Sequence, residues 1–397
     1  MRPGAIAAVA VVSALLGGVA SLALARASGL VDVSTETVLV ETTVAGTPAA
    51  GAKATPELGR TFHPARIYER SSPGVVTVFA LFEPGDDPGN HVAQGSGFVV
   101  SRQGHVLTSA HVITRSGPLE SAGRLFVEFS DRDRVPAKLV GVDPYDDVGV
   151  LRIDPDAHRL QPLPLGDSDR VVVGEPVAAI GSPFGNVDSL AVGVVSATGR
   201  SIDSLSAAYT IVDAIQTDAP ITHGNSGGPL LDARGRVIGI NAQIRSESGG
   251  SEGVGFAVPI NSASRSMRQL LADGRVSYPY VGITSDDLTP SIARRLGQPV
   301  RRGALISRVL RDGPAAEAGL KGGNRRIEVD GRIVTRGGDV IVAIGGSPVT
   351  NKDDVARLLI RRYDAGDSAT FTIVRDGRRQ RVQVDLEERP PRPNLGG

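Results

Sequence analysis

Short apolar runs recur along most of the chain between about residues 64 and 260, and each is bounded by glycine, proline or aspartate. Such runs at fairly regular spacing are typical of strands in an all-β sandwich or barrel. We therefore expect mainly β structure over about 200 residues. The runs lie at 75–80, 95–100, 106–108, 125–129, 137–142, 148–153, 176–180, 190–195, 214–217, 237–240 and 255–259.

The pattern changes to a helical period at residues 260–273, which we expect to form a closing helix. A second and smaller unit begins near Tyr278. It combines short strand patterns with a helix predicted over 352–362, and Asp330–Gly331 between alternating runs predicts a hairpin within 321–337. Its strands are expected at 281–283, 304–306, 339–344 and 369–374. The proline-rich end, 390–397, is expected to be disordered.

The first residues form a long uncharged segment. After Arg2, residues 3–25 are rich in alanine, valine and leucine, and a run of this length can cross a bilayer as a helix. The alternative is a cleaved signal peptide, because Ala23–Leu24–Ala25 resembles a processing site. The length favours an uncleaved anchor over 1–27, followed by a flexible linker over 28–62. Both alternatives place the remaining chain outside the cytoplasm.

Composition narrows the classes of function. Lysine plus arginine and aspartate plus glutamate both number 43, so the net charge is zero and nothing indicates a nucleic-acid partner. Cysteine is absent, which excludes a disulfide framework, a thiolate metal site and a cysteine nucleophile. The six histidines are scattered and no H-E-x-x-H pattern occurs, so we expect no metal and no other cofactor.

A serine lies in a glycine-rich segment at Gly224–Leu230 (GNSGGPL). A nucleophilic serine needs a base, usually histidine, and the histidine needs a carboxylate to fix its tautomer. His111 follows an apolar strand pattern directly, and Asp147 begins another. We expect these two side chains to complete the set, with Asp143 and Asp146 capping the turn before Asp147. The order of histidine, aspartate and serine along the chain points to a double β-barrel.

These segments resemble the HtrA/DegP/DegS family of trypsin-like serine proteases that carry a PDZ domain. The matching segments follow one another in order over residues 94–259. They are 94–98 (QGSGF), 108–111 (TSAH), 147–151 (DVGVL), 181–185 (GSPFG), 217–219 (TDA), 224–230 (GNSGGPL) and 255–259 (GFAVP). The resemblance implies a trypsin-like protease domain over 63–273, made of two six-stranded barrels, and one PDZ domain over 277–389.

The resemblance also implies roles for residues. Ser226 would be the nucleophile, His111 the general acid and base, and Asp147 the residue that orients it. The amides of Gly224, Asn225 and Ser226 would form the oxyanion hole. Trypsin has an acid about six residues before its serine. Pro220 and Ile221 stand at this place here, so we expect a pocket for a small apolar P1 side chain.

In the second domain, the segment Tyr280-Val281-Gly282-Ile283 resembles the PDZ loop that captures the carboxylate of a peptide C-terminus. The hairpin within 321–337 departs from the family pattern. The family implies ATP-independent cleavage of misfolded or signalling proteins, often by homotrimers. The alternative is a chaperone or peptide-binding scaffold on a protease fold, although all three triad residues are present.

Overall fold

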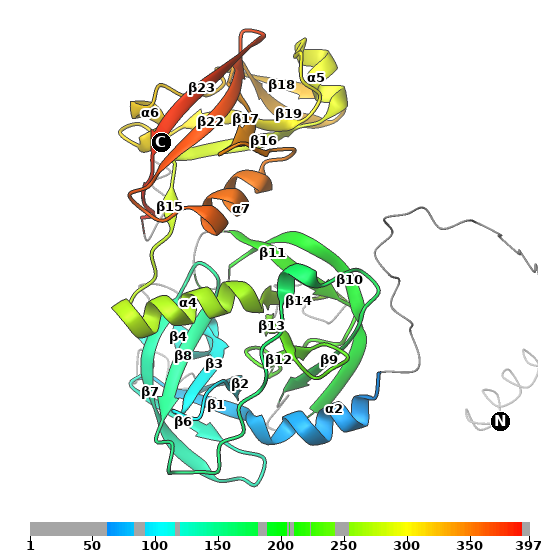
Figure 1. The fold of residues 1–397 in the computed structure, drawn as a ribbon, viewed down its shortest axis with the longest axis vertical. Coiled ribbons are helices and arrows are strands. Elements are labelled where there is room, and N and C mark those ends of the chain that lie inside the picture. The colour runs from blue at the N-terminus through cyan, green and yellow to red at the C-terminus, as the bar shows by residue number, and fades with distance from the viewer. Residues whose placement is uncertain are drawn as a thin grey trace, which may run out of the picture. The chain divides into compact units, whose positions relative to one another are not determined.

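Two closed six-stranded barrels follow one another along the first part of the chain (Figure 1). The computed structural model describes residues 62–82, 92–115, 120–181, 189–204, 206, 210–222, 224–242 and 254–390. The predicted anchor and most of the predicted linker lie outside these ranges. Among the residues described, no helix combines the length and apolar character needed to cross a membrane.

The first barrel closes in the strand order β1-β2-β3-β8-β7-β6. Its interior is an apolar cluster that includes Val78, Val127 and Leu151, each inaccessible to solvent. Its strands are β1 (Val75–Leu81), β2 (Val92–Val99), β3 (His105–Ser109), β6 (Arg124–Glu128), β7 (Arg134–Asp143) and β8 (Val148–Ile153). The short helix α3 (Ala110–Ile113) and the pair β4 (Thr114–Arg115) and β5 (Glu120–Ser121) follow β3.

The second barrel closes in the order β10-β11-β14-β13-β12-β9. Every residue of β13 is buried, as expected for a short apolar run enclosed by its neighbours. The strands are β9 (Pro176–Gly181), β10 (Ser189–Asp203), β11 (Thr210–Thr217), β12 (Pro229–Leu231), β13 (Val237–Ala242) and β14 (Gly255–Pro259). The prediction of two barrels, each with six strands, is confirmed.

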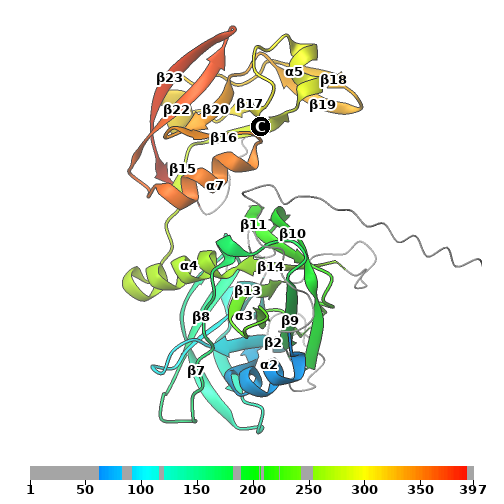
Figure 2. The same ribbon diagram turned by 45° about the vertical axis from the view of Figure 1, so that its right-hand side comes forward.

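Helices cover the outside of the barrels. The predicted closing helix is α4 (Ile260–Asp273), which buries Ile260, Ala263 and Leu270 and ends at the left-handed residue Gly274. Figure 2 shows α4 lying across the ends of strands from both barrels. The sequence did not predict α2 (Pro64–Ser71) or the two 3₁₀ turns, η1 (Ser72–Gly74) and η2 (Ser168–Arg170).

The C-terminal domain is built on a sheet in the order β16-β17-β20-β22-β23. Helix α7 (Asp353–Arg362) packs on one face through Val355 and Leu359, and the opposite face is covered by α5 (Pro290–Leu296) and the predicted hairpin. The strands are β16 (Ile283–Leu288), β17 (Gly303–Val309), β20 (Val340–Ile344), β22 (Ser368–Arg375) and β23 (Arg378–Asp385), with β21 (Ser347–Pro348) paired to β20.

The remaining elements of this domain are small. The hairpin consists of β18 (Arg325–Val329) and β19 (Arg332–Arg336), and its turn residues Asp330 and Gly331 both have positive φ. Helix α6 (Pro314–Glu317) precedes it. Strand β15 (Pro279–Tyr280) pairs with β24 (Glu387–Glu388), so the first and last strands of the domain lie together. The strand predicted at 281–283 is wrong in its bounds: Val281 and Gly282 form a loop between β15 and β16.

Candidate active site

Two segments of the first barrel bring His111 and Asp147 together. His111 lies on α3 directly after β3, and Asp147 ends the turn between β7 and β8. Strands β3 and β8 are antiparallel neighbours with Ser109 opposite Val148, so the end of one strand meets the start of the other. The Ala110 amide then donates to the Asp147 carbonyl at 3.0 Å. The two predicted residues are therefore adjacent although they are distant in sequence.

The carboxylate of Asp147 is buried and binds His111 at two points, the imidazole and the backbone amide. His111 Nδ1 lies 2.6 Å from Asp147 Oδ2, and the His111 backbone N–H donates to Oδ1 at 2.9 Å. The Asp147 side chain is 1% exposed and that of His111 is 20% exposed. With Nδ1–H donating to Asp147, the other ring nitrogen can accept a proton, which is the tautomer that a general base requires.

Burial and the Asp147 carboxylate shift the pKa of the imidazole in opposite directions. Burial by itself lowers the pKa of His111, but the negative charge of Asp147 and the hydrogen bond to it raise the pKa more, and the net result lies above the usual value. The protonated ring is therefore stabilised in the site. A histidine that must accept and then hold a proton benefits from this environment.

The turn that carries Ser226 lies at the junction of the barrels. The Ser226 carbonyl accepts from the Ser96 amide of β2 at 2.8 Å, which ties the turn to the first barrel. The Gly227 amide donates to the Asn241 carbonyl of β13 at 2.8 Å, which ties it to the second. A Cβ on Gly227 would lie 2.9 Å from the Ser109 amide, so this turn packs directly against the end of β3 that leads into His111.

The hydroxyl of Ser226 is buried and makes no hydrogen bond within the described part of the chain. His111 and Ser226 are thus held in neighbouring segments without the hydrogen bond that would join them. Catalytic hydrogen bonds are often long or unformed in unliganded enzymes and tighten when substrate binds. Two of the three predicted triad side chains, those of His111 and Asp147, are thus hydrogen-bonded to each other before substrate binds.

The residues predicted for the oxyanion hole lie in the same turn. Gly224 has a φ of 96°, and its carbonyl accepts from Ser96 Oγ at 2.5 Å. The Asn225 amide donates to the Thr222 carbonyl at 3.0 Å, so it points into the turn in this conformation. The Asn225 side-chain amide donates to Pro220 O at 3.3 Å, while its oxygen is buried without a partner among the described residues.

The two residues predicted for the S1 pocket differ in their surroundings. Ile221 is 6% exposed and packs in the apolar cluster of the second barrel with Ala219 and Val195. A Cβ on Gly255 would lie 2.5 Å from the Ile221 side chain, so β14 passes close beside it. Pro220 is exposed. Of these two residues, Ile221 is packed among apolar side chains and Pro220 faces solvent.

The other histidines have structural surroundings where they are described. His105 bonds to Ser101 Oγ at 2.8 Å, and its pKa is lowered by burial and by the charge of Arg152. The ring of His158 stacks on Phe129 at 3.7 Å between centroids. His63 precedes α2. His91 and His223 lie outside the described residues.

Asp143 was predicted to cap the turn before Asp147, and its Oδ1 does accept from the Tyr145 and Asp146 amides. The sequence did not show that the same carboxyl is completely buried, with Ser266 Oγ at 2.6 Å and Tyr278 Oη at 2.5 Å from its other oxygen. Burial and the neighbouring Asp146 raise the pKa of Asp143 to about 6. No local pattern marks this cluster, because its members come from three separate segments.

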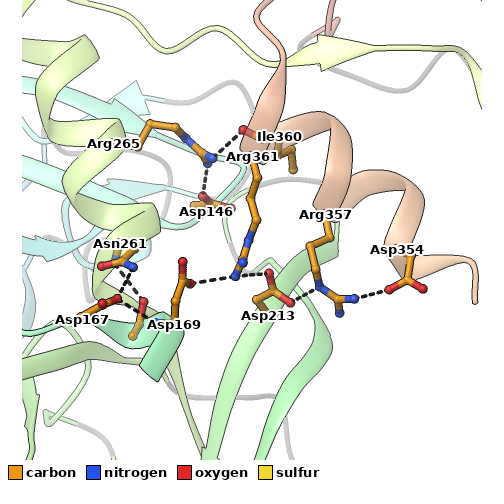
Figure 3. A network of polar contacts seen from close by, with 11 residues as sticks. Asp146, Asp167, Asp169, Asp213, Asn261, Arg265, Asp354, Arg357, Ile360 and Arg361 are labelled. Carbon is orange, nitrogen blue, oxygen red and sulfur yellow. Dashed lines mark hydrogen bonds and ion pairs between the residues drawn. The ribbon is translucent and has the colours of Figure 1, made fainter. Parts of the chain in front are cut away.

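A second polar network connects α7 with the barrels (Figure 3). Arg361 pairs with Asp169 at 2.8 Å and with Asp213 of β11 at 3.0 Å. Arg357 pairs with the same Asp213 and with Asp354 of its own helix. These contacts link the helix that borders β16 in the C-terminal domain to the strand that leads toward the Ser226 turn.

The predicted carboxylate-binding loop surrounds Gly282, which has a φ of 75°. The carbonyls of Val281 and Gly282 accept from Ala315 and Leu310 at 2.9 Å each, so the loop is tied to the segment around α6. Strand β16 leaves this loop as an edge strand of its sheet, because β17 is its one partner among the described strands. An edge strand of this kind can accept a further strand from a peptide.

Comparison with known proteins identifies the family of each domain. The chain matches the model of a trypsin-like peptidase domain over residues 95–240 and that of a PDZ domain over 279–386. A DegP-like periplasmic serine endoprotease of Pseudomonas putida (strain W619) is 40% identical over 296 residues, which cover 75% of this chain and 56% of the relative. This chain thus spans little more than half the length of that relative.

Two further comparisons cover more of the matching protein. Protease Do-like 1, chloroplastic, of Arabidopsis thaliana is 38% identical over 330 residues, which cover 82% of this chain and 72% of the relative. The solved structure of the HtrA-type protease AlgW with a tripeptide has 33% identity and a TM-score of 0.68, and the match covers 83% of this chain and 98% of that one. The domains, their order and these relatives show that the chain belongs to the HtrA-type family of trypsin-like serine proteases with a PDZ domain.

Proposed function

We propose that this protein is a serine endopeptidase that cleaves unfolded or partly folded proteins outside the cytoplasm. The observation that carries the proposal is the buried Asp147–His111 pair, which lies beside the turn that holds Ser226. The extracytoplasmic location is supported by the periplasmic relatives and by the apolar segment at the N-terminus.

The chemistry follows from these positions. His111 takes the proton of the Ser226 hydroxyl while the oxygen attacks the carbonyl carbon of the substrate, and Asp147 stabilises the imidazolium that forms. His111 then returns the proton to the leaving amine, which leaves an acyl group on Ser226. Water activated by the same ring hydrolyses this ester and restores the serine.

The amides of Gly224 and Ser226 are the proposed donors to the tetrahedral oxyanion. One such donor contributes on the order of 3 kcal/mol of transition-state stabilisation. A contribution from Asn225, which the sequence also predicted, requires its amide to leave the Thr222 carbonyl. The turn would then rearrange as substrate binds, which agrees with the missing bond between Ser226 and His111.

A fluorophosphonate probe tests this reaction. We expect the wild-type protein to be labelled and to degrade an unfolded protein, and Ser226→Ala to do neither. As the pH is lowered, kcat/KM should fall with a midpoint above the usual histidine pKa. His111 must be neutral to act as a base, and the charge of Asp147 favours its protonated form. A labelled Ser226→Ala variant would exclude Ser226 as the nucleophile.

The buried Ile221 supports a preference for a small apolar P1 residue. Because Pro220 and Ile221 stand where trypsin has its acid, a basic P1 side chain would lack that partner, at a cost of several kcal/mol. Peptides that differ only at P1 should be cleaved fastest after valine, alanine or leucine. Preferential cleavage after arginine or lysine would refute this specificity.

We further propose that the PDZ domain binds peptide C-termini between β16 and α7 and thereby alters protease activity. The contacts of Arg357 and Arg361 with Asp213 support such coupling, because a peptide beside α7 can change them. Addition of a C-terminal peptide should change the cleavage rate of the full chain. A chain truncated before residue 277 that keeps the same response would refute the coupling.

The predicted anchor over 1–27 and a homotrimeric assembly complete the proposal. The anchor is supported by the apolar composition of the segment, and the trimer by the family resemblance. Membrane fractionation of the full chain tests the anchor, and light scattering of the extracytoplasmic part tests the trimer. A soluble full-length chain, or a monomer at the concentration of the activity assay, would refute the respective statement.

The alternative function is a chaperone or peptide-binding scaffold. One observation favours it: the Ser226 hydroxyl has no hydrogen bond to His111 among the described residues. A scaffold would prevent aggregation of an unfolded protein equally well as wild type and as Ser226→Ala, and neither form would yield cleavage products. The protease predicts products from the wild type alone.

A further inference from the structure

The carboxylate of Asp147 has a third hydrogen-bond donor, which comes from the other barrel. Ser206 Oγ donates to Asp147 Oδ1 at 2.5 Å. Ser206 lies between β10 and β11 of the second barrel, whereas Asp147 belongs to the first. The oxygen Oδ2 faces His111 Nδ1, and Oδ1 is shared by the His111 amide and Ser206.

The segment that carries Ser206 is fixed against the turn that carries Asp147. Ser204 Oγ donates to the Pro144 carbonyl at 2.8 Å. Two hydroxyls that are two residues apart thus bind the start and the end of the turn between β7 and β8. The Ser206 amide in turn donates to Ser204 Oγ at 3.2 Å, so this second contact helps to hold Ser206 at the carboxylate.

We propose that Ser206 is a positioning residue for catalysis, which fixes the plane of the Asp147 carboxylate so that Oδ2 stays in line with His111 Nδ1. This inference rests on the proposed protease function. The last torsion of an aspartate side chain is broad, and the two other bonds to this carboxylate both come from His111 itself. Ser206 adds a donor from the second barrel, which fixes the carboxylate against a segment other than the one that carries the imidazole. The bond is charge-assisted and shielded from water, which makes it stronger than a neutral one.

Ser206 also affects the charge that His111 experiences. A hydroxyl that donates to Oδ1 withdraws negative charge from the carboxylate, which weakens its stabilisation of the imidazolium. Without this donor, the carboxylate would hold the imidazolium more tightly but in a less defined orientation. Removal of the hydroxyl is therefore expected to change both the rate and its pH dependence.

Two substitutions at residue 206 separate positioning from a general role in folding. We expect Ser206→Ala to lower kcat roughly 10- to 100-fold, the effect of one hydrogen bond to a charged group, with KM nearly unchanged. The acid limb of its pH profile should move to higher pH. Ser206→Thr keeps the hydroxyl and should restore most of the rate. Ser204→Ala removes the hydroxyl that binds the Pro144 carbonyl and accepts from the Ser206 amide, but it leaves the Ser206 hydroxyl in place, so it should lower kcat less than Ser206→Ala does.

A proton NMR spectrum of the His111 Nδ1–H provides a measurement that does not need turnover. Its resonance should shift in Ser206→Ala and return in Ser206→Thr. A wild-type protein that the fluorophosphonate fails to label would refute the proposed function, whereas this shift would still establish the bond to Asp147. An unchanged resonance with unchanged kcat in Ser206→Ala, or equal losses in Ser204→Ala and Ser206→Ala, would overturn the proposal.

Discussion

A single methyl group at Gly227 should disrupt the junction between the barrels. Gly227 has a φ of 85°, in the left-handed region that disfavours any side chain. A Cβ built there would lie 2.2 Å from the Ser96 carbonyl oxygen, 2.5 Å from Thr108 Oγ1 and 2.9 Å from the Ser109 amide. Two of these three atoms belong to the backbone of the first barrel and can yield only if its strands shift.

The loss of unfolding free energy expected in Gly227→Ala has two contributions. The left-handed backbone costs a residue with a side chain about 1 kcal/mol, and overpacking of a close-packed region costs a further 1–3 kcal/mol or so. Gly227→Ala should therefore lose about 2–4 kcal/mol of unfolding free energy. Displacement of the adjacent Ser226 by about 1 Å should also lower kcat/KM on the order of 100-fold.

Gly235→Ala is the matched control. Gly235 has a φ of 75°, but a Cβ there would find its nearest atom at 3.8 Å, so only the cost of the backbone conformation remains. We expect a loss of about 1 kcal/mol and unchanged activity. Urea unfolding and the rate of fluorophosphonate labelling measure both quantities. Equal stability and equal labelling of the two variants would refute the close approach of the Ser226 turn to the first barrel.

Two further predictions concern buried carboxylates. The pKa of Asp143 is raised from 3.8 to about 6, so its contribution to stability is complete below pH 4 and is lost as the pH rises through 6, in total about 3 kcal/mol. Unfolding measured between pH 4 and 7 should show this decline, and Asp143→Asn should flatten it; an equally steep decline in the variant would refute the assignment. Asp339 is 1% exposed and accepts from Arg375 Nε at 2.7 Å and Nη2 at 2.6 Å. Arg375→Leu should destabilise the PDZ domain by about 3 kcal/mol, because a buried charge loses its partner, and Arg375→Lys should lose less; a loss below 1 kcal/mol would contradict this.

The sequence predicted best those elements whose apolar residues repeat within one short segment. Strands β8 and β14 and helix α4 begin and end at the predicted residues, because glycine, proline or aspartate bounds each run. Strand β23 was missed because its three arginines and two glutamines conceal the alternation, and only Val384 is buried. Helix α2 was missed for a similar reason, since it buries only Ile67 and Ser71.

The residues of the candidate site likewise differ in whether a local sequence pattern marks them. His111, Asp147 and Ser226 could be predicted because each lies in a short segment with a recognisable pattern. Ser206 could not, because it is a lone serine whose partner is 59 positions away and because β10 was expected to end at 195 rather than at Asp203. Contacts made by one polar side chain across a fold have no local signal.

Because β15 pairs with β24, the chain begins and ends the C-terminal domain at adjacent positions. Pro279 lies opposite Glu388, and Tyr145 of the protease domain donates to the carbonyl of Arg389 just beyond. A module with adjoining ends can be excised, duplicated or exchanged without opening its own sheet. Gene rearrangement could therefore vary the number and kind of such recognition modules behind one hydrolytic core while leaving both folds intact.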